Sequence, residues 1–169
     1  MFEIGSCVVY GSNGVCRIEE IRSESFSGQA KDYYILSPLD DPKMVIYVPT
    51  DAPALTEQMR ELLSVEQLHT LIHQGTKDEL LEWISDPRRR SDMFRSILQS
   101  GDRRLLWRML RTIHLRREEQ AQLGRKLYAA DEMAFARGEK LLHGEIAAVL
   151  RIHPDQVQSY IQSQLRENG

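Results

Sequence analysis

The fold of the first part of the chain is decided at residues 7–21, which read Cys7-Val8-Val9-Tyr10-Gly11-Ser12-Asn13-Gly14-Val15-Cys16-Arg17-Ile18-Glu19-Glu20-Ile21. A short apolar run, residues 7–10, is followed by four turn-forming residues, 11–14. In residues 15–21, alternate side chains would then lie on opposite sides of a strand. Glycine and asparagine adopt the backbone conformations of tight turns, and a period of two is typical of a β-strand. These residues therefore predict two strands joined by a tight turn.

The same pattern continues to about residue 50. A second turn at Ser27-Gly28 precedes an apolar strand at 33–36, and a third turn at 40–42 precedes a strand at 44–48. Short strands joined by tight turns favour a small SH3- or Tudor-like β-barrel. Pro49 and Pro53 mark its end, so we expect a barrel domain at residues 1–54.

A helical period begins after this boundary. Residues 64–67 and 76–79 both fit the capping box that opens a helix, and Asp86-Pro87 supplies an N-cap and a proline at the first helical position. We expect helices from about 64, 76, 86, 102, 129 and 154, the second of them carrying Trp83 toward the core. The fold class is therefore α+β, with a barrel followed by an all-α domain at residues 55–169.

The charge of the helical part is concentrated in residues 88–126. This block holds 12 of the chain's 22 basic residues and only four acidic ones, a local charge of +8 in a protein whose net charge is −3. Eleven of the twelve are arginines, whose planar guanidinium group matches phosphate and carboxylate. The block predicts an anionic partner. Its members are Arg88, Arg89, Arg90, Arg95, Arg103, Arg104, Arg108, Arg111, Arg116, Arg117, Arg125 and Lys126.

Three of these arginines, Arg88, Arg89 and Arg90, occupy the first turn of an expected helix. The macrodipole makes that end of a helix positive, so cations are unfavourable there unless an anion binds. A phosphate group would be stabilised by the guanidinium groups and by the free N–H groups of the turn. The alternative is that these arginines pair with neighbouring carboxylates and need no ligand.

Three further arginines, Arg104, Arg108 and Arg111, fall at spacings of four and three, so they share one helix face. Such a stripe is typical of a surface that contacts the nucleic-acid backbone without reading bases. Trp107 belongs to the same helix and is expected to pack beneath the arginine stems.

The sequence contains no catalytic constellation and no phosphate-binding loop, so we expect neither an enzyme nor a cofactor. His69 and His73 have the spacing of a metal pair but lack a third ligand, and we expect no metal. Cys7 and Cys16 are expected to be reduced thiols. No apolar run is long enough to span a membrane, and residues 1–5 do not resemble a secretion signal, so we expect a cytoplasmic protein.

The order and spacing of the strand motifs resemble the CarD/CdnL family of bacterial transcription regulators. The resemblance rests on Phe2-x-Ile4-Gly5, Val8-Val9-Tyr10, Gly14-Val15-Cys16-x-Ile18-x-x-Ile21, Tyr33-Tyr34-Ile35-Leu36 and Val45-Ile46-Tyr47-Val48-Pro49. It extends more diffusely through Met59-Arg60-Glu61, Arg89-Arg90, Ser100-Gly101-Asp102 and Leu141-Leu142-x-Gly144-Glu145.

The resemblance implies a partner for each domain. In this family the barrel, which is related to the polymerase-interacting domain of transcription-repair coupling factors, binds the β subunit of RNA polymerase. Val45, Ile46 and Tyr47 would make that contact here. The family's helical domain contacts promoter DNA at the upstream fork of the transcription bubble and stabilises the open complex, a role that would fall to Arg89 and Arg90.

One position departs from the family pattern. Many relatives place a tryptophan just before the arginine pair, where it wedges into the minor groove, and this chain has Pro87 there. Contact with DNA without such a wedge would be electrostatic, made by Arg88, Arg89, Arg90, Arg104, Arg108 and Arg111.

The sequence thus predicts a transcription regulator that binds polymerase through its barrel and promoter DNA through its helical domain. The alternative is an adaptor that binds polymerase or another protein through the barrel, with its arginines serving acidic protein surfaces or internal ion pairs. The pattern leaves open whether the protein activates or represses, and whether it is a monomer or a strand-swapped dimer.

Overall fold

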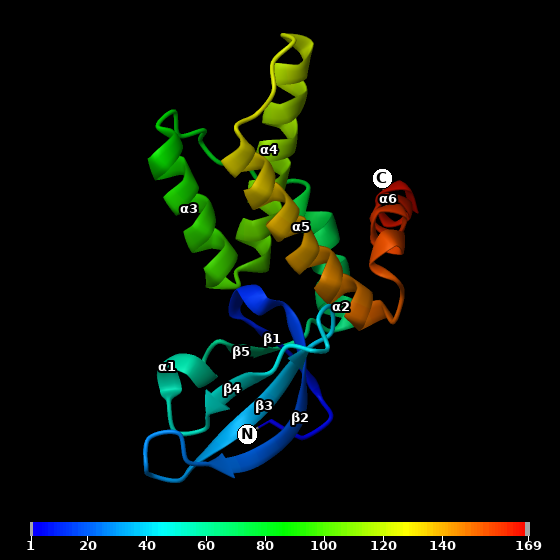
Figure 1. Cartoon of the computed structure of the whole chain (residues 1–169). Helices are drawn as coiled ribbons and strands as arrows, with labels where there is room; N and C mark the ends of the chain where they lie inside the picture. Colours follow the sequence, from blue (N-terminus) through cyan, green and yellow to red (C-terminus); the bar gives the residue numbers. More distant parts are fainter. Residues whose placement is uncertain (1, 168–169) are drawn as a thin grey trace. The chain divides into compact units, whose positions relative to one another are not determined.

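The computed structural model describes residues 2–167 and divides the chain into two compact units. The first ends at Leu62 and the second begins at Leu63. The first is built on a β-sheet and the second on helices, which confirms the α+β class (Figure 1). In the described part of the chain, no helix is long and apolar enough to cross a membrane.

The sheet unit contains a five-stranded antiparallel sheet in the order β4-β3-β2-β1-β5. The turn expected at residues 11–14 is a short 3-10 helix, η1, followed by Gly14 at a positive φ of 77°. Glycine adopts this conformation without a steric penalty. The strands are β1 (Cys7–Tyr10), β2 (Val15–Glu24), β3 (Lys31–Pro38), β4 (Ile46–Pro49) and β5 (Met59–Glu61). An SH3- or Tudor-like closure of this sheet stays a prediction.

Alternation along the strands determines what the sheet unit buries. A bulge between Ile18 and Glu20 shifts the pairing of β2 with β3. Before the bulge, Val15, Cys16 and Ile18 are buried, and after it no residue of β2 is buried. Cys16 is fully buried in this core as a free thiol, and burial raises its pKa to about 12. The core comprises Val8, Tyr10, Cys16, Ile18, Tyr34, Leu36, Val48 and Met59.

The boundary between the units lies eight residues after the expected one at 54/55. After the short helix α1 (Pro53–Thr56), the chain returns to the sheet as β5, where Met59 pairs with Tyr10 and is buried. Three residues of strand are too short for a periodic signal in the sequence. Residues 55–62 therefore belong to the sheet unit and not to the helical domain.

The helical unit contains five α-helices: α2 (Val65–Gly75), α3 (Pro87–Ser100), α4 (Arg103–Gln122), α5 (Ala129–Leu150) and α6 (Val157–Glu167). A 3-10 turn, η2 (Pro154–Gln156), precedes α6. The expected N-caps are confirmed at Ser64, which forms a capping box with Gln67, and at Asp86 and Asp102. The capping box expected at residues 76–79 is wrong, because residues 76–86 form neither helix nor strand.

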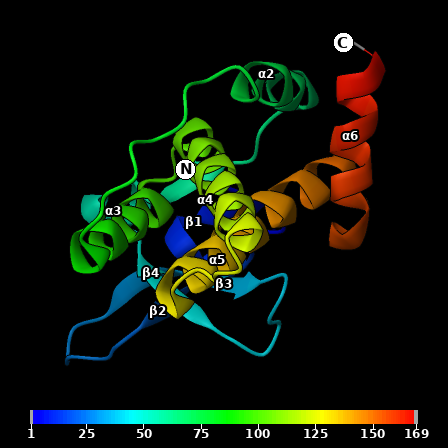
Figure 2. The same cartoon turned by 90° about the horizontal axis from the view of Figure 1, so that it is seen from above.

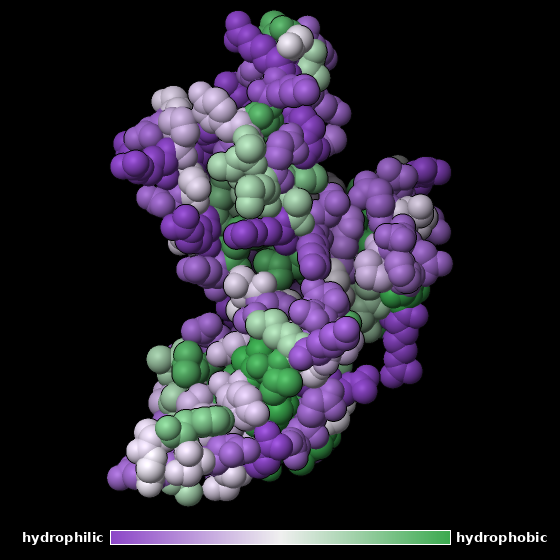
Figure 3. Space-filling view, in the orientation of Figure 1, coloured by the Kyte–Doolittle hydropathy of each residue, from purple (hydrophilic) through white to green (hydrophobic). Residues whose placement is uncertain are grey.

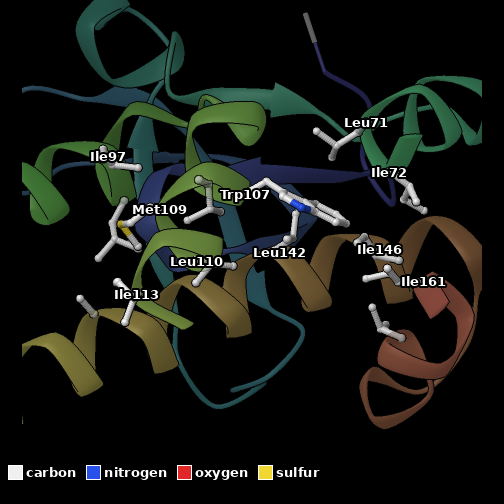
Figure 4. Packing of buried hydrophobic residues seen from close by; sticks show 14 of the residues in the cluster. Leu71, Ile72, Ile97, Trp107, Met109, Leu110, Ile113, Leu142, Ile146 and Ile161 are labelled. Carbon is white, nitrogen blue, oxygen red and sulfur yellow. The ribbon is translucent and has the colours of Figure 1, made fainter. Parts of the chain in front are cut away.

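The core of the helical unit lies between α4, α5, α2, α3 and α6. Trp107 of α4 is buried there, together with Ile72 of α2 and Leu142 and Ile146 of α5 (Figure 4). Two glycines allow close packing. A Cβ atom on Gly75 would lie 3.3 Å from Trp107, and one on Gly138 would lie 2.9 Å from Leu110. Helix α4 is therefore the central element of this unit.

Candidate functional sites

The open edge of the sheet carries the three residues expected to bind a protein. Strand β4 pairs with β3 alone among residues 2–167, so one edge of its backbone is free to accept another strand. Ile46 and Tyr47 belong to β4, and Val45 immediately precedes it. Ile46 packs against the core, whereas Val45 and Tyr47 are exposed. The unpaired edge of β4 thus lies next to two exposed side chains, Val45 and Tyr47.

Tyr47 belongs to an aromatic cluster on the outer face of the sheet. Its ring lies 5.2 Å from that of Phe26 and 6.1 Å from that of Tyr33, and Phe26 lies 5.3 Å from Tyr33, all in edge-to-face geometry. Phe26 is 63% exposed, although it is among the most apolar residues of the unit. Exposed aromatic side chains that hold one another in place are typical anchors of protein interfaces.

Charged side chains border this aromatic cluster. Arg22 donates a hydrogen bond of 3.1 Å to the hydroxyl of Tyr47 and forms ion pairs with Glu20 and Glu24 at 2.9 and 2.7 Å. An apolar centre with a polar border is the usual composition of a protein interface. Hydrophobic residues also gather on the face of the sheet unit that Figure 3 shows. We call Val45, Tyr47, Phe26 and Tyr33 the sheet-edge surface.

Phe26 was missed by the sequence analysis because it lies in the turn between β2 and β3. A large aromatic residue in an otherwise small and polar turn, Ser25 to Gly28, is the signal that could have found it. Turn residues do not follow a strand period, so nothing in the pattern placed Phe26 beside Tyr47.

In the helical unit, the arginine stripe of α4 contacts the chain itself. Arg104, Arg108 and Arg111 do share a face, as expected, but that face is covered by residues 75–79. Arg104 forms a bidentate ion pair with Asp78, with both N···O distances 2.6 Å. Arg108 donates to the carbonyl of Glu79 at 2.8 Å, and Arg111 donates to the carbonyls of Gly75 and Asp78 at 3.0 and 2.7 Å.

Arg90 lies in the interior and not on the surface expected for it. Its side chain is 3% exposed, and it forms a bidentate ion pair with Asp131 at 2.9 and 2.8 Å. A third donor reaches the carbonyl of Ile84 at 2.8 Å. The guanidinium carbon lies 4.6 Å from the centre of the Trp83 ring and 5.5 Å from that of Tyr128. With its donors used in this way, Arg90 holds α3 against α5.

A helical spacing in the sequence already distinguishes Arg90 from its two neighbours. Residues 90, 94 and 97 fall on one face of α3, and Phe94 and Ile97 are buried. Arg88 and Arg89 fall on other faces and are exposed. Within residues 2–167, the side chains of these two arginines form no hydrogen bond or ion pair, which leaves their donors available to a ligand.

The Arg90–Asp131 pair places the first turn of α3 beside the first turn of α5. Exposed cations occur at both places, Arg88 and Arg89 on α3 and Arg125 and Lys126 just before α5. Half-buried Arg116 of α4 completes the group. Its guanidinium carbon lies 5.2 Å from the centre of the Trp83 ring, and it forms an ion pair with Glu119 at 3.7 Å. Two helix N-termini add their positive ends to these charges. We call Arg88, Arg89, Arg116, Arg125 and Lys126 the exposed basic surface.

Trp83 is packed between two arginines and does not project as a wedge. It lies between Arg90 and Arg116 and contacts Phe94, with ring centres 6.1 Å apart. This confirms that Trp83 belongs mainly to the core. Pro87 is the first residue of α3, directly after its N-cap Asp86.

Groups that could hold a metal are absent from residues 2–167, since no three histidine, cysteine, aspartate or glutamate side chains gather there. His69, one of the two histidines with metal-pair spacing, lies 2.7 Å from the hydroxyl of Tyr160 on α6. That contact joins α2 to α6.

Comparison with known families bears directly on the sheet unit. Residues 2–63 match the family model described as the CarD-like/TRCF RID domain. This part of the chain is a CarD-like/TRCF RID domain. The match covers almost the same residues as the sheet unit, and the RID domain therefore includes β5. A comparison with curated proteins found no match.

The RID match supports an RNA-polymerase-interacting, transcription-related protein and confirms the resemblance seen in the strand motifs. The sheet-edge surface lies wholly within the RID domain. The helical unit, from Leu63 onward, lies almost wholly outside the match, and its role has to be argued from its own surface.

Proposed function

We propose that the chain is a bacterial, cytoplasmic and non-enzymatic transcription regulator. It binds the β subunit of RNA polymerase through the sheet-edge surface and the promoter DNA backbone through the exposed basic surface, and it thereby modulates the stability of the open complex. The observation that carries the proposal is the RID match over residues 2–63, on a sheet whose edge strand carries exposed Tyr47 and is directly preceded by exposed Val45.

The sheet edge supports the polymerase half of the proposal. A free strand edge accepts a partner strand through backbone hydrogen bonds, and neighbouring side chains supply the specificity. Val45 precedes such an edge, and Tyr47, Phe26 and Tyr33 form an aromatic face beside it. Few residues usually dominate the energy of an interface, and they are often tyrosines.

The exposed basic surface supports the DNA half. Arg88 and Arg89 have free donors in the first turn of α3, where the backbone N–H groups also favour an anion. Arg125 and Lys126 add two cations at the start of α5. This set replaces the expected one in part, because Arg90 is buried and Arg104, Arg108 and Arg111 hold residues 75–79.

A pull-down of the polymerase β subunit tests the first contact. Replacement of Tyr47 by aspartate places a charge in the aromatic cluster, and we expect binding to fall by about 30-fold or more, the effect of losing an interface anchor. Tyr128→Asp is the matched control, because it changes an exposed tyrosine of the helical unit and should leave β-subunit binding unchanged. Equal binding by the Tyr47 variant and the wild type would contradict this docking site.

A salt titration of DNA binding tests the second contact. We expect Arg88→Gln with Arg89→Gln to weaken binding to forked promoter DNA and to reduce the slope of log K against log salt by about 2, one for each lost phosphate contact. Arg95→Gln with Arg137→Gln removes the same charge from exposed positions outside the basic surface. If both pairs weaken binding equally, the contact is not at Arg88 and Arg89.

An adaptor without DNA contact is the second candidate. It is favoured by the number of arginines that bind acidic groups or carbonyls of the same chain, among them Arg90, Arg103, Arg104, Arg111 and Arg117. This candidate predicts that the Arg88 and Arg89 variant binds polymerase, associates with promoter DNA and supports promoter opening as the wild type does.

A further inference from the structure

Residues 76–86 form the connection between α2 and α3 that Figure 2 shows. This segment is acidic, and its first residues contact the arginine stripe of α4. We call this segment the acidic strap. It contains four carboxylates, Asp78, Glu79, Glu82 and Asp86, against the single cation Lys77, a net charge of −3. It has no helix or strand of its own. Its position therefore depends on side chains donated by neighbouring helices.

Arginines of α4 supply the bonds that hold the first half of the strap. Arg104 binds the Asp78 carboxylate with two bonds of 2.6 Å and also reaches the side-chain oxygen of Gln74 at 3.2 Å. Arg111 binds the carbonyl of Asp78, and Arg108 binds that of Glu79. One carboxylate and two carbonyls of the strap, together with the carbonyl of Gly75 at the end of α2, thus accept hydrogen bonds from the three guanidinium groups.

The geometry at Asp78 is also the geometry with which arginine binds phosphate. In both cases two parallel N–H groups of one guanidinium meet two oxygens of one anion. The hydrogen bond and charge of Arg104, helped by the charges of Arg108 and Arg111, lower the pKa of the Asp78 carboxyl below its ordinary value, which favours the ionised form. An ionised carboxylate in a bidentate pair stands where a phosphate group would bind.

The Asp78 contact is open to competition. The side chain of Arg104 is 53% exposed, so an incoming anion can reach it from solvent, whereas the side chain of Asp78 is 18% exposed. The bidentate geometry makes this pair stronger than a single-contact surface pair, but water and salt still screen the exposed guanidinium group. A polyanion that offers several phosphates can therefore exchange with a single carboxylate.

The second half of the strap is fixed more firmly. The backbone N–H of Leu81 donates to the hydroxyl of buried Thr112 at 2.9 Å, and Arg90 holds the carbonyl of Ile84. Leu81 and Trp83 pack against the core. Displacement is thus confined to residues 76–80, between the end of α2 and Leu81, and the core need not open.

We propose that Arg104, Arg108 and Arg111 form a second phosphate-binding site, which the acidic strap occupies in the unliganded protein and yields to a phosphate-bearing polyanion. The site is distinct from the exposed basic surface. The identification of the ligand as the DNA backbone rests on the proposed function. The exchange of the Asp78 carboxylate for a phosphate group does not depend on it. Free polyphosphate is the other source of the same chemical group.

Replacement of Asp78 by asparagine tests the exchange in the full-length protein. It removes the competing carboxylate, and we expect binding of labelled duplex DNA to tighten about two- to fivefold, with a salt slope steeper by about 1. Glu82→Gln is the matched control, because it removes the same charge from the same strap at an exposed residue with no arginine partner among the described residues. It should change binding less than Asp78→Asn does.

A double variant tests whether any gain in DNA affinity depends on Arg104. Asp78→Asn with Arg104→Gln should bind DNA no more tightly than Arg104→Gln alone. A gain that persists without Arg104, or equal gains from Asp78→Asn and Glu82→Gln, would overturn the proposal. Circular dichroism of each variant verifies that the helical unit is folded.

Inorganic tripolyphosphate, used as a second probe, distinguishes a site for free polyphosphate from a site for the DNA backbone. This measurement does not depend on whether the protein binds DNA. The backbone NMR chemical shifts of residues 76–80 should change when duplex DNA is added to the wild-type protein, and those of residues 81–86 should change less. The same change with tripolyphosphate means a general phosphate site, and no change with either probe overturns the proposal. If Arg88 and Arg89 prove irrelevant to DNA while tripolyphosphate still displaces the strap, the proposed function fails and this site stands.

Discussion

Arg90 illustrates how the surroundings of one side chain decide its role. It follows two arginines of the same chemistry, yet it alone is enclosed by Trp83, Tyr128 and Asp131. A buried guanidinium is tolerated only if a counter-ion and hydrogen-bond acceptors replace its lost water. Asp131 and the carbonyl of Ile84 supply them. In the bidentate pair of Arg103 with Glu145, at 2.6 and 2.7 Å, the buried partner is the carboxylate, which is 4% exposed.

Replacement of Asp131 by asparagine should therefore destabilise the protein severely. It leaves the Arg90 charge buried without a counter-ion, and we expect the free energy of unfolding to fall by about 3 kcal/mol or more. Urea denaturation followed by circular dichroism measures the change. Asp92→Asn removes a carboxylate from an exposed pair with Arg95 on the same helix and should cost well under 1 kcal/mol. Similar losses for the two variants would mean that Arg90 is not buried.

At the scale of elements, α4 serves two structural roles on opposite faces. Leu106, Met109 and Leu110 pack against α5, while Arg104, Arg108 and Arg111 hold the acidic strap. The contact with α5 is close because Gly138 has no side chain. Packing of this kind is sensitive to one added methyl group.

Gly138→Ala tests this packing. The new Cβ would lie 2.9 Å from Leu110 and 3.0 Å from Met109, both in the core, and we expect a loss of about 1 kcal/mol or more despite the higher helix propensity of alanine. Gly144→Ala on the same helix meets nothing within 4 Å and should be neutral or should stabilise by about 0.5–1 kcal/mol. Thermal unfolding compares them. A gain in stability for both variants would contradict the close contact at Gly138.

Short sequence patterns predicted the starts of those helices that are fixed by hydrogen bonds between neighbouring residues. The capping box at Ser64 and the N-caps at Asp86 and Asp102 form as expected, because each bond lies within one turn of chain. The similar pattern at Thr76 to Glu79 does not open a helix. There the carboxylate and carbonyls bind arginines 26 to 33 residues later in the chain, a partnership that no local pattern reveals.

At the scale of the whole molecule, each unit has a core of its own. The core residues of the sheet unit lie between Val8 and Met59, and those of the helical unit between Leu68 and Ile161. The strand motifs predicted the sheet unit and its family well, because an alternating pattern and its turns are visible in the sequence. The boundary was placed too early, since β5 has only three residues and its pairing with β1 joins residues that lie 49 to 53 positions apart in the chain.

The sequence predicted the net charge of the arginine-rich block correctly, but it did not predict which of these arginines are exposed to a ligand. The block of residues 88–126 does carry +8, but much of it faces carboxylates contributed by other segments, such as Asp78, Asp131, Glu132 and Glu145. Those partners lie outside the block. A count within a window of sequence therefore overestimates the positive charge that a ligand meets.

The internal use of so many arginines has a consequence for selectivity in the cell. A chain that displayed all twelve cations would be held by any nucleic acid, and genomic DNA offers competing sites in vast excess. Under the proposed function, contact with DNA alone would be weak and short-lived, because few cations are free. Tethering by polymerase would raise the effective concentration of promoter DNA around the helical unit, and the same weak contact would then suffice. Under the proposed function, occupancy would follow the location of polymerase and not the abundance of DNA.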